Sequence, residues 1–429
     1  MTRILLIVAA LSALGWSILA AADDRHAGAP LTLAAAMHAT LENNPALKTF
    51  RVRREELLAE HKTAGLRPPL KLRVGIENVA GTGTLEGTEQ AELTLALSHV
   101  VELGGQQTAR VSVAGSRQDL LETEQQSVQL DLLATVARRF VHVRADQERL
   151  ALATEATALS RRTLESVERR VRAGQSPQAE RARARAALAQ AELDAEHAAH
   201  ELGAARVRLA SLWGESRPNF NRATGDLLAV GEPGDMDRLM ATIEANPDIA
   251  RFDRRRRMRN AELRLAEAQS RGGVEFSGGL RRLEGTEDTA LVFGASLPLF
   301  SASRSQGEIM AADARYRLTE HDRQAAILEI RSGLYSIYQE RIHALTAVEV
   351  LHGEIIPQLT AALNDTRRAY ESGRYGYQEF AAAQRELLNA RRSLIDAAET
   401  AHINRIELER LAGMPLEPTL FSAREEPSS

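Results

Sequence analysis

The feature that most constrains this chain is an internal duplication with an offset of about 200 residues. ENNPAL at 42–47 is matched by EANPDI at 244–249, and LWG at 212–214 is matched by LAG at 411–413. The offset falls only from 202 to 199 between these matches, so the two halves correspond along their whole length. Solenoid repeats are much shorter than this, and a period near 200 residues therefore indicates a duplicated domain.

Within each copy, two segments alternate apolar and polar residues with a period of two, which is typical of β-strands. We expect strands at about 70–78 and 90–99, and again at about 273–282 and 289–298. One apolar and one polar face over this length suits a membrane β-barrel, although a half-buried hairpin of a soluble domain alternates in the same way. Four strands cannot close a membrane barrel, since the smallest use about eight. The barrel interpretation therefore requires several chains.

After each strand pair the helical period returns and persists. Residues 106–172 contain no proline, and at about 1.5 Å per residue they predict a helix near 100 Å long. A break at 174–177 precedes a returning helix, which gives a helical hairpin over about 106–212. The second copy predicts the same hairpin over about 307–411, with its break at 373–376. Helices of this length favour coiled-coil packing over a globular core.

Composition removes several classes of function. The chain has no cysteine, which excludes disulfides and thiolate chemistry, and its net charge of −4 comes with dispersed basic residues that leave no nucleic-acid footprint. No nucleophile triad, phosphate loop or zinc signature is present, so we expect neither an enzyme nor a cofactor. His197 and His200 share a helix and His99 ends a strand, but this set is too sparse to predict a metal site.

The two ends of the chain differ from the rest. Arg3, the apolar run 4–20 and the small residues that follow predict a secretion signal over 1–22, with a single membrane anchor as the alternative. The polar residues 414–429 predict a disordered tail. Between these ends we expect two structural repeats, at 31–214 and 236–413.

These elements, in this order and twice over, resemble the TolC-like outer-membrane efflux family across the whole mature chain. Two pairs of motifs resemble the heavy-metal (cobalt–zinc–cadmium) subgroup of this family. They are ELTLALS at 92–98 leading into VELGG at 101–105, and LPLF at 297–300 followed by QGEI at 306–309. Two departures are Val100, where proline is usual, and Gln106-Gln107, where basic residues are common.

The resemblance implies a mainly α fold with a membrane β-barrel: a homotrimer with a twelve-stranded barrel in outer-membrane lipid and an α-helical tunnel through the periplasm of a Gram-negative cell. It also implies that the duct works with a periplasmic adaptor and an inner-membrane pump of the RND type, and that it conducts heavy-metal cations. Multidrug efflux and type I secretion ducts share this architecture and stay open as alternatives. A periplasmic adaptor or a coiled-coil scaffold would lack the two alternating pairs of strands and hairpins.

The resemblance further implies roles for the breaks between the long helices. They form the periplasmic mouth and meet the adaptor, which assigns docking to Arg172, Gly174, Gln175, Ser176, Pro177, Gly373, Arg374, Tyr375 and Gly376. Six residues beyond each first glycine lie Glu180 and Glu379, candidates for an acidic ring at the entrance that favours cations. The family's second acidic position falls on Ala382, and acids near a helix start also simply favour the helix dipole.

Overall fold

The computed structural model describes residues 28–299 and 301–416. The expected signal segment 1–22 and the tail from 417 onward lie outside the described residues. The chain divides into two compact units. Unit 1 takes the described residues up to 48, 128–246 and those from 330 onward, and unit 2 takes 49–127 and 247–329.

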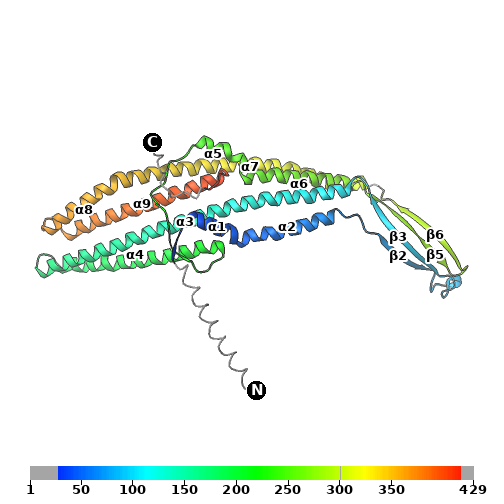
Figure 1. The fold of residues 1–429 in the computed structure, drawn as a ribbon, viewed down its shortest axis with the longest axis horizontal. Coiled ribbons are helices and arrows are strands. Elements are labelled where there is room, and N and C mark those ends of the chain that lie inside the picture. Colours follow the sequence, from blue (N-terminus) through cyan, green and yellow to red (C-terminus); the bar gives the residue numbers. More distant parts are fainter. Residues whose placement is uncertain (1–27, 300, 417–429) are drawn as a thin grey trace, which may run out of the picture. The chain divides into compact units, whose positions relative to one another are not determined.

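The first half of the chain contains two helices, a strand pair and a helical hairpin (Figure 1). Its elements are α1 Leu33–Asn43, α2 Pro45–Ala64, β2 Lys71–Glu77, β3 Glu92–Glu102, α3 Gln106–Arg172 and α4 Gln178–Ala210. The long helix expected from Gln106 to Arg172 is confirmed as one uninterrupted α-helix. β3 runs three residues past the expected end, because its last residues still pair with β5.

The second half repeats the same order of elements. They are α6 Pro247–Gln269, β5 Gly273–Leu283, β6 Asp288–Ser296, α7 Ser301–Val350, α8 Ile356–Glu371 and α9 Tyr377–Leu411. α7 begins six residues before the expected start at 307, and a π-helical turn, Leu351–Ile355, joins it to α8. Sequence reasoning named no element at α1, β1 Ala29–Leu31, β4 Phe220–Ala223 or α5 Met236–Thr242.

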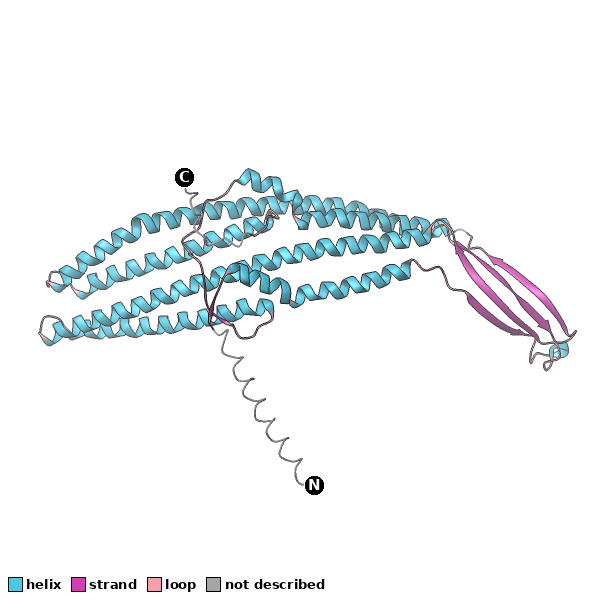
Figure 2. Ribbon diagram, in the orientation of Figure 1, coloured by secondary structure: helices cyan, strands magenta, loops and turns pink. Residues whose placement is uncertain are grey.

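Unit 2 holds a four-stranded antiparallel sheet in the order β2-β3-β5-β6 (Figure 2). Leu95 of β3 pairs with Val74 on one side and Leu280 on the other, so apolar side chains share one face. That face is uncovered, with Phe293 78% and Leu291 70% exposed. The opposite face is polar: Arg281 of β5 binds Glu92 at 2.8 Å and donates to Thr94 Oγ1 at 3.1 Å. β2 and β6 are the two edge strands of this sheet.

The two repeated sequence motifs contact each other in unit 1, once per copy. The buried Asn44 Nδ2 donates to Leu212 O at 2.7 Å, and the buried Asn246 Nδ2 donates to Leu411 O at 2.7 Å. Each amide satisfies a carbonyl at the end of a returning helix that has no partner within the helix. Gly413 has a φ of +68°, and a Cβ there would lie 2.6 Å from Asn246 Cα. The Asn-Pro and Leu-x-Gly motifs therefore recur together because they form one joint.

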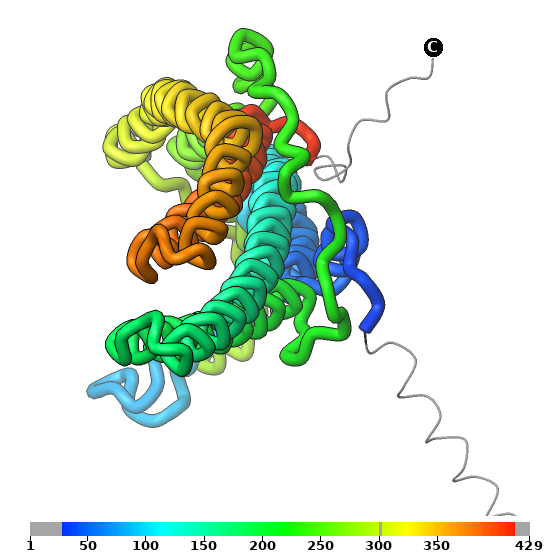
Figure 3. Tube along the Cα trace, turned by 90° about the vertical axis from the view of Figure 1, so that its left-hand side faces the viewer, coloured from blue at the N-terminus to red at the C-terminus, as the bar shows by residue number. Residues whose placement is uncertain are grey.

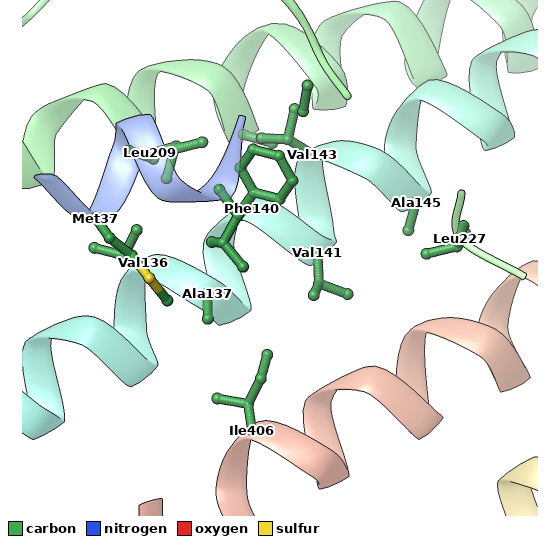
Figure 4. Packing of buried hydrophobic residues seen from close by; sticks show 14 of the residues in the cluster. Met37, Val136, Ala137, Phe140, Val141, Val143, Ala145, Leu209, Leu227 and Ile406 are labelled. Carbon is green, nitrogen blue, oxygen red and sulfur yellow. The ribbon is translucent and has the colours of Figure 1, made fainter. Parts of the chain in front are cut away.

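The core of unit 1 lies along α3, where α1, α4 and α9 pack on it. Phe140, Val136 and Val141 of α3 are fully buried, and Ile406 of α9 faces Ala137 and Val141 (Figure 4). An antiparallel series of polar contacts, which we call the α3–α9 seam, flanks this core. Its ion pairs are Asp131–Arg410 (2.5 Å), Arg138–Glu407, Arg149–Asp396 (2.6 Å), Arg149–Glu399 and Glu155–Arg391 (2.7 Å), and His142 Nδ1 shares a hydrogen bond of 2.5 Å with Glu399 Oε1.

The connection between the two halves crosses unit 1 as an extended strap, residues 220–234 (Figure 3). Three long helices hold its backbone. Gln147 of α3 exchanges two hydrogen bonds with Ala223, and His402 of α9 binds Leu227 O through Nε2 at 2.9 Å. Arg341 of α7 donates to Val230 O (3.1 Å), Glu232 O (2.7 Å) and Ala401 O (2.6 Å). The strap thereby fixes α3, α7 and α9 relative to one another.

Candidate functional site: the paired hairpin tips

Both helical hairpins turn through the same backbone device. Gly174 and Gly373 have φ values of +71° and +76°, which glycine adopts without strain. Gln175 N–H donates back to Arg170 O, and Arg374 N–H donates back to Ala369 O, each at 2.9 Å. These are the six-to-one bonds of a Schellman cap, which ends a helix and reverses the chain. Pro177 and Gly376 then serve as the N-cap residues of α4 and α9.

The two tips, residues 172–177 and 372–376, lie next to a shared apolar cluster in unit 1. Its buried members are Val167 and Ala184 from the first hairpin and Tyr370, Tyr377 and Phe380 from the second. Tyr370 and Phe380 stack with ring centroids 5.3 Å apart. The tips are therefore packed against each other instead of standing alone in solvent.

Arg170 of α3 contacts Tyr370 of the second hairpin and also Ser176 of its own tip. Its Nη1 donates to Tyr370 O at 2.6 Å, and its guanidinium lies 4.7 Å from the centroid of the Tyr370 ring. Its Nε donates to Ser176 Oγ at 3.2 Å. Sequence reasoning missed Arg170 because it stands in a run with Arg169 and Arg172, where nothing marks it out. Tyr370, Tyr377 and Phe380 were also missed, although an aromatic residue on both sides of the Gly373 turn was a usable signal.

The residues expected to dock an adaptor divide into exposed and packed groups. Arg172, Gln175 and Arg374 are exposed, as is Tyr375, whose exposed fraction is 51%. Ser176 is half-buried because it accepts the hydrogen bond from Arg170. The remaining members, Gly174, Pro177, Gly373 and Gly376, shape the backbone of the two turns. The exposed side chains present mixed polar and aromatic groups to solvent.

The two carboxylates considered for an acidic ring occupy equivalent first turns but different surroundings. Glu180 of α4 is half-buried beside the aromatic cluster. Burial of Tyr370 raises the pKa of its hydroxyl, and the negative charge of Glu180 raises it further. Burial likewise raises the pKa of Tyr377. Glu379 of α9 is exposed to solvent. The environment of Glu379 therefore suits a group that acts on passing ions, whereas Glu180 belongs to the packing of the tips.

A groove of about 940 Å³ in unit 1 is lined by residues of α3, α4 and α9. Small side chains such as Ala153 and Ala187 line it together with Arg183, Arg385 and Arg392. Across 28–299 and 301–416, no three His, Asp or Glu side chains are grouped so as to hold a metal ion. Over the same residues, no helix has the length and apolar character needed to cross a membrane.

Comparison with known proteins places this fold. The family model described as "Outer membrane efflux protein" matches residues 36–215 and 239–414. The cobalt-zinc-cadmium resistance protein CzcC of Cupriavidus metallidurans is 26% identical over 367 residues, 86% of each chain. The structure of CusC superposes with a TM-score of 0.76 at 18% identity, over 91% of this chain and 94% of that one.

The outer membrane channel MtrE of Neisseria gonorrhoeae, solved in its open state, superposes with a TM-score of 0.71 at 20% identity, over 89% of both chains. These likenesses to solved structures establish the TolC-like fold, and the family model covers most of the sequence. The chain therefore belongs to the outer membrane efflux protein family.

Proposed function

We propose that this protein is the outer-membrane duct of a tripartite efflux system that exports heavy-metal cations. The observation that carries the proposal is the 26% identity to a cobalt-zinc-cadmium resistance protein over 86% of both chains. In the proposed system an inner-membrane pump of the RND type and a periplasmic adaptor deliver the substrate, and the duct conducts it outward. The duct itself needs no tight metal site, since conduction requires weak binding.

The open sheet supports a trimeric barrel. β2 and β6 end the sheet on both sides, and an exposed edge strand invites pairing with another chain. The apolar face, with Phe293 and Leu291 exposed, suits contact with lipid, and the polar face with Arg281 and Glu92 suits a wet lumen. Three copies would supply twelve strands. The proposed repeats 31–214 and 236–413 agree in position with the two segments of the family match.

Docking of the adaptor is proposed for the two tips, which include the exposed Tyr375 and the half-buried Ser176. Tyr375 and Ser176 test it, because charged replacements there alter the surface while the two turns keep their glycines. We expect Tyr375→Glu and Ser176→Asp to abolish metal resistance at an unchanged level of trimer in the outer membrane. Full resistance in both variants would refute docking at these residues.

An entrance filter is proposed for Glu379, which threefold symmetry would repeat around the axis as a ring of three carboxylates. Glu379→Gln is expected to lower the preference of the reconstituted channel for cations over anions. Glu180→Gln is the matched comparison, since its half-buried position predicts a change in tip packing. Unchanged ion selectivity in Glu379→Gln would reject the ring.

The substrate is tested by deletion and complementation. A strain that lacks this gene is expected to become sensitive to cobalt, zinc and cadmium salts, and the wild-type chain to restore growth. Sensitivity to hydrophobic drugs with unchanged metal tolerance would favour the multidrug alternative. Loss of a secreted protein with unchanged metal and drug tolerance would favour a type I secretion duct.

A further inference from the structure

A hollow of about 630 Å³ in unit 1 is lined by residues of α3 and α4, and we call it the α3–α4 hollow. Its wall contains three guanidinium groups and one imidazole but only two carboxylates, so positive charge is in excess. The lining residues from α3 are Thr135, Arg138, Arg139, His142 and Asp146, and those from α4 are Glu201, Ala205 and Arg208.

The two carboxylates of the hollow leave Arg139 without a counter-charge. Asp146 binds Arg149 at 3.0 Å, and Arg149 is not part of the lining. Glu201 lies 3.8 Å from Arg208, a long distance for an ion pair, and both side chains are more than half exposed. Across 28–299 and 301–416, no carboxylate lies within ion-pair distance of Arg139. The excess positive charge is therefore greatest around Arg139.

The guanidinium of Arg139 is held at the end of α4. Its Nη1 donates to Arg208 O and also to Ser211 Oγ, the latter at 3.3 Å, and it thereby caps the last turn of the helix. Capping uses this one nitrogen, and within the described part of the chain Nε and Nη2 of Arg139 make no hydrogen bond. Burial, and then the charges of Arg208 and Arg138, lower the pKa of Arg139. Arg139 thus keeps unused donors at a point where positive charges crowd together.

Two further lining side chains are positioned by contacts with α9. Arg138 pairs with Glu407, and its Nη2 donates to Thr135 Oγ1 at 2.9 Å. His142 contacts Glu399 through Nδ1 at 2.5 Å, and among the described residues its Nε2 makes no hydrogen bond. Side chains that are already fixed lose little conformational entropy when a ligand binds. One wall of the hollow is therefore preorganised.

We propose that the α3–α4 hollow binds a free phosphate ion, with the guanidinium groups of Arg139 and Arg208 as its main contacts. A guanidinium presents N–H donors in a fixed fork that matches an oxoanion, and charge-assisted hydrogen bonds are stronger than neutral ones. Ala205 is the one apolar side chain of the lining, so the hollow suits a small ion and not the acyl chains of a phospholipid. The inference goes beyond the proposed export function and does not depend on it.

Calorimetric titration of the full-length, detergent-purified protein with sodium phosphate tests the site, with sodium chloride added to keep the ionic strength constant. We expect the wild-type protein to bind phosphate saturably. Arg139→Gln and Arg208→Gln are each expected to weaken binding about tenfold, because each removes a charge-assisted hydrogen bond. Arg208 contributes only its backbone carbonyl to the cap of α4, so Arg208→Gln leaves that cap in place.

Two further variants separate binding from a structural effect. Glu201→Gln removes the carboxylate near Arg208, and it is expected to strengthen phosphate binding about threefold. Arg161→Gln is the matched control: Arg161 of α3 pairs with Glu192 of α4 at 2.9 Å, both side chains are exposed, and neither lines the hollow. This control is expected to bind phosphate as the wild-type protein does.

The contrary outcomes are equally specific. Absence of saturable binding to the wild-type protein would overturn the site. Equal binding by the wild-type protein, Arg208→Gln and Glu201→Gln would overturn it too, since phosphate would then act as a general salt. Glycerol phosphate is titrated in parallel to distinguish a phosphate ester from the free ion. Binding of the ester without binding of inorganic phosphate would overturn the assignment to the free ion.

Discussion

Two surfaces of the same helical unit are built from opposite chemistry. The α3–α9 seam is closed by ion pairs, and its central Glu399 is only 8% exposed while it binds both His142 and Arg149. The outer sides of α4 and α7 carry Leu193 and Tyr335 more than half exposed. Charged pairs fix which residues stand opposite each other, whereas apolar stripes gain free energy only when another surface covers them. The seam is thus complete within one chain, whereas the outer sides of α4 and α7 leave apolar side chains uncovered.

The largest expected effect comes from placing a charge on the uncovered apolar face of the sheet, which faces lipid in the proposed duct. Phe293→Arg places a charge on the apolar face of the sheet, at a cost of roughly 2–4 kcal/mol per copy near mid-membrane. Because the proposed duct contains three copies, we expect the protein to disappear from the outer-membrane fraction on immunoblots. Ser296→Arg, on the polar face of the same strand, is the matched control and is expected to insert normally. Equal insertion of both variants would contradict the assignment of the two faces.

A smaller effect is expected from opening the closed seam. Glu399→Gln removes the buried carboxylate that Arg149 and His142 share. We expect the free energy of unfolding to fall by about 3 kcal/mol, the low end for a broken buried ion pair. The loss is at the low end because Arg149 keeps its ion pairs with Asp146 and Asp396. Thermal unfolding of the detergent-purified protein measures it. The Arg368–Asp365 pair, with both side chains about 70% exposed, supplies the control, and Asp365→Asn is expected to change stability by less than about 0.5 kcal/mol. Similar melting of the two variants would show that the seam contributes no more than a surface pair.

The contact between His402 and the strap makes the stability of unit 1 depend on pH. Burial, and then the charges of Arg341 and Arg405, lower the pKa of His402 from 6.5 to about 4, against the hydrogen bond to Leu227 O and the charge of Asp226. The unfolded chain therefore binds a proton at this histidine below about pH 6.5, whereas the folded chain binds it only below about pH 4. The contribution of His402 to stability is therefore fully present above pH 6.5 and is lost as the pH falls from 6.5 toward 4.

Between pH 7 and pH 5 this group is expected to remove about 2 kcal/mol of stability. His402→Gln, whose amide can still donate to Leu227 O, is expected to lose that part of the pH dependence. Melting temperatures of wild type and variant at the two pH values measure it. Parallel curves for both proteins would contradict a buried neutral His402.

The elements of the fold could be predicted from the sequence because their signals are periodic and long. The alternation around Leu93, Leu95 and Leu97 marks β3, and the proline-free run to Arg172 marks α3. The repeated Asn-Pro and Leu-x-Gly motifs were visible as well, but their direct contact was not, since it joins residues 168 positions apart. The π-helical turn at Leu351–Ile355 also left no periodic signal, because one extra residue in a long helix barely shifts the pattern.

The site was predictable in its turns and unpredictable in its contacts. Gly174 and Gly373 predict the two chain reversals, because only glycine adopts their φ values freely. The role of Arg170 depends on a carbonyl and a ring 200 residues away, and Arg341 likewise binds carbonyls of the strap that no local pattern connects to it. Contacts between distant segments depend on tertiary packing, which periodicity and spacing do not encode.

In the proposed duct, one chain is an incomplete part of a closed assembly. The most direct measurement is the mass of the unheated complex extracted from the outer membrane in mild detergent, by light scattering with the detergent contribution subtracted. We expect three copies per particle, which convert to single chains on heating. A stable single chain in the outer membrane, with its sheet edges and the outer sides of α4 and α7 uncovered, would contradict it.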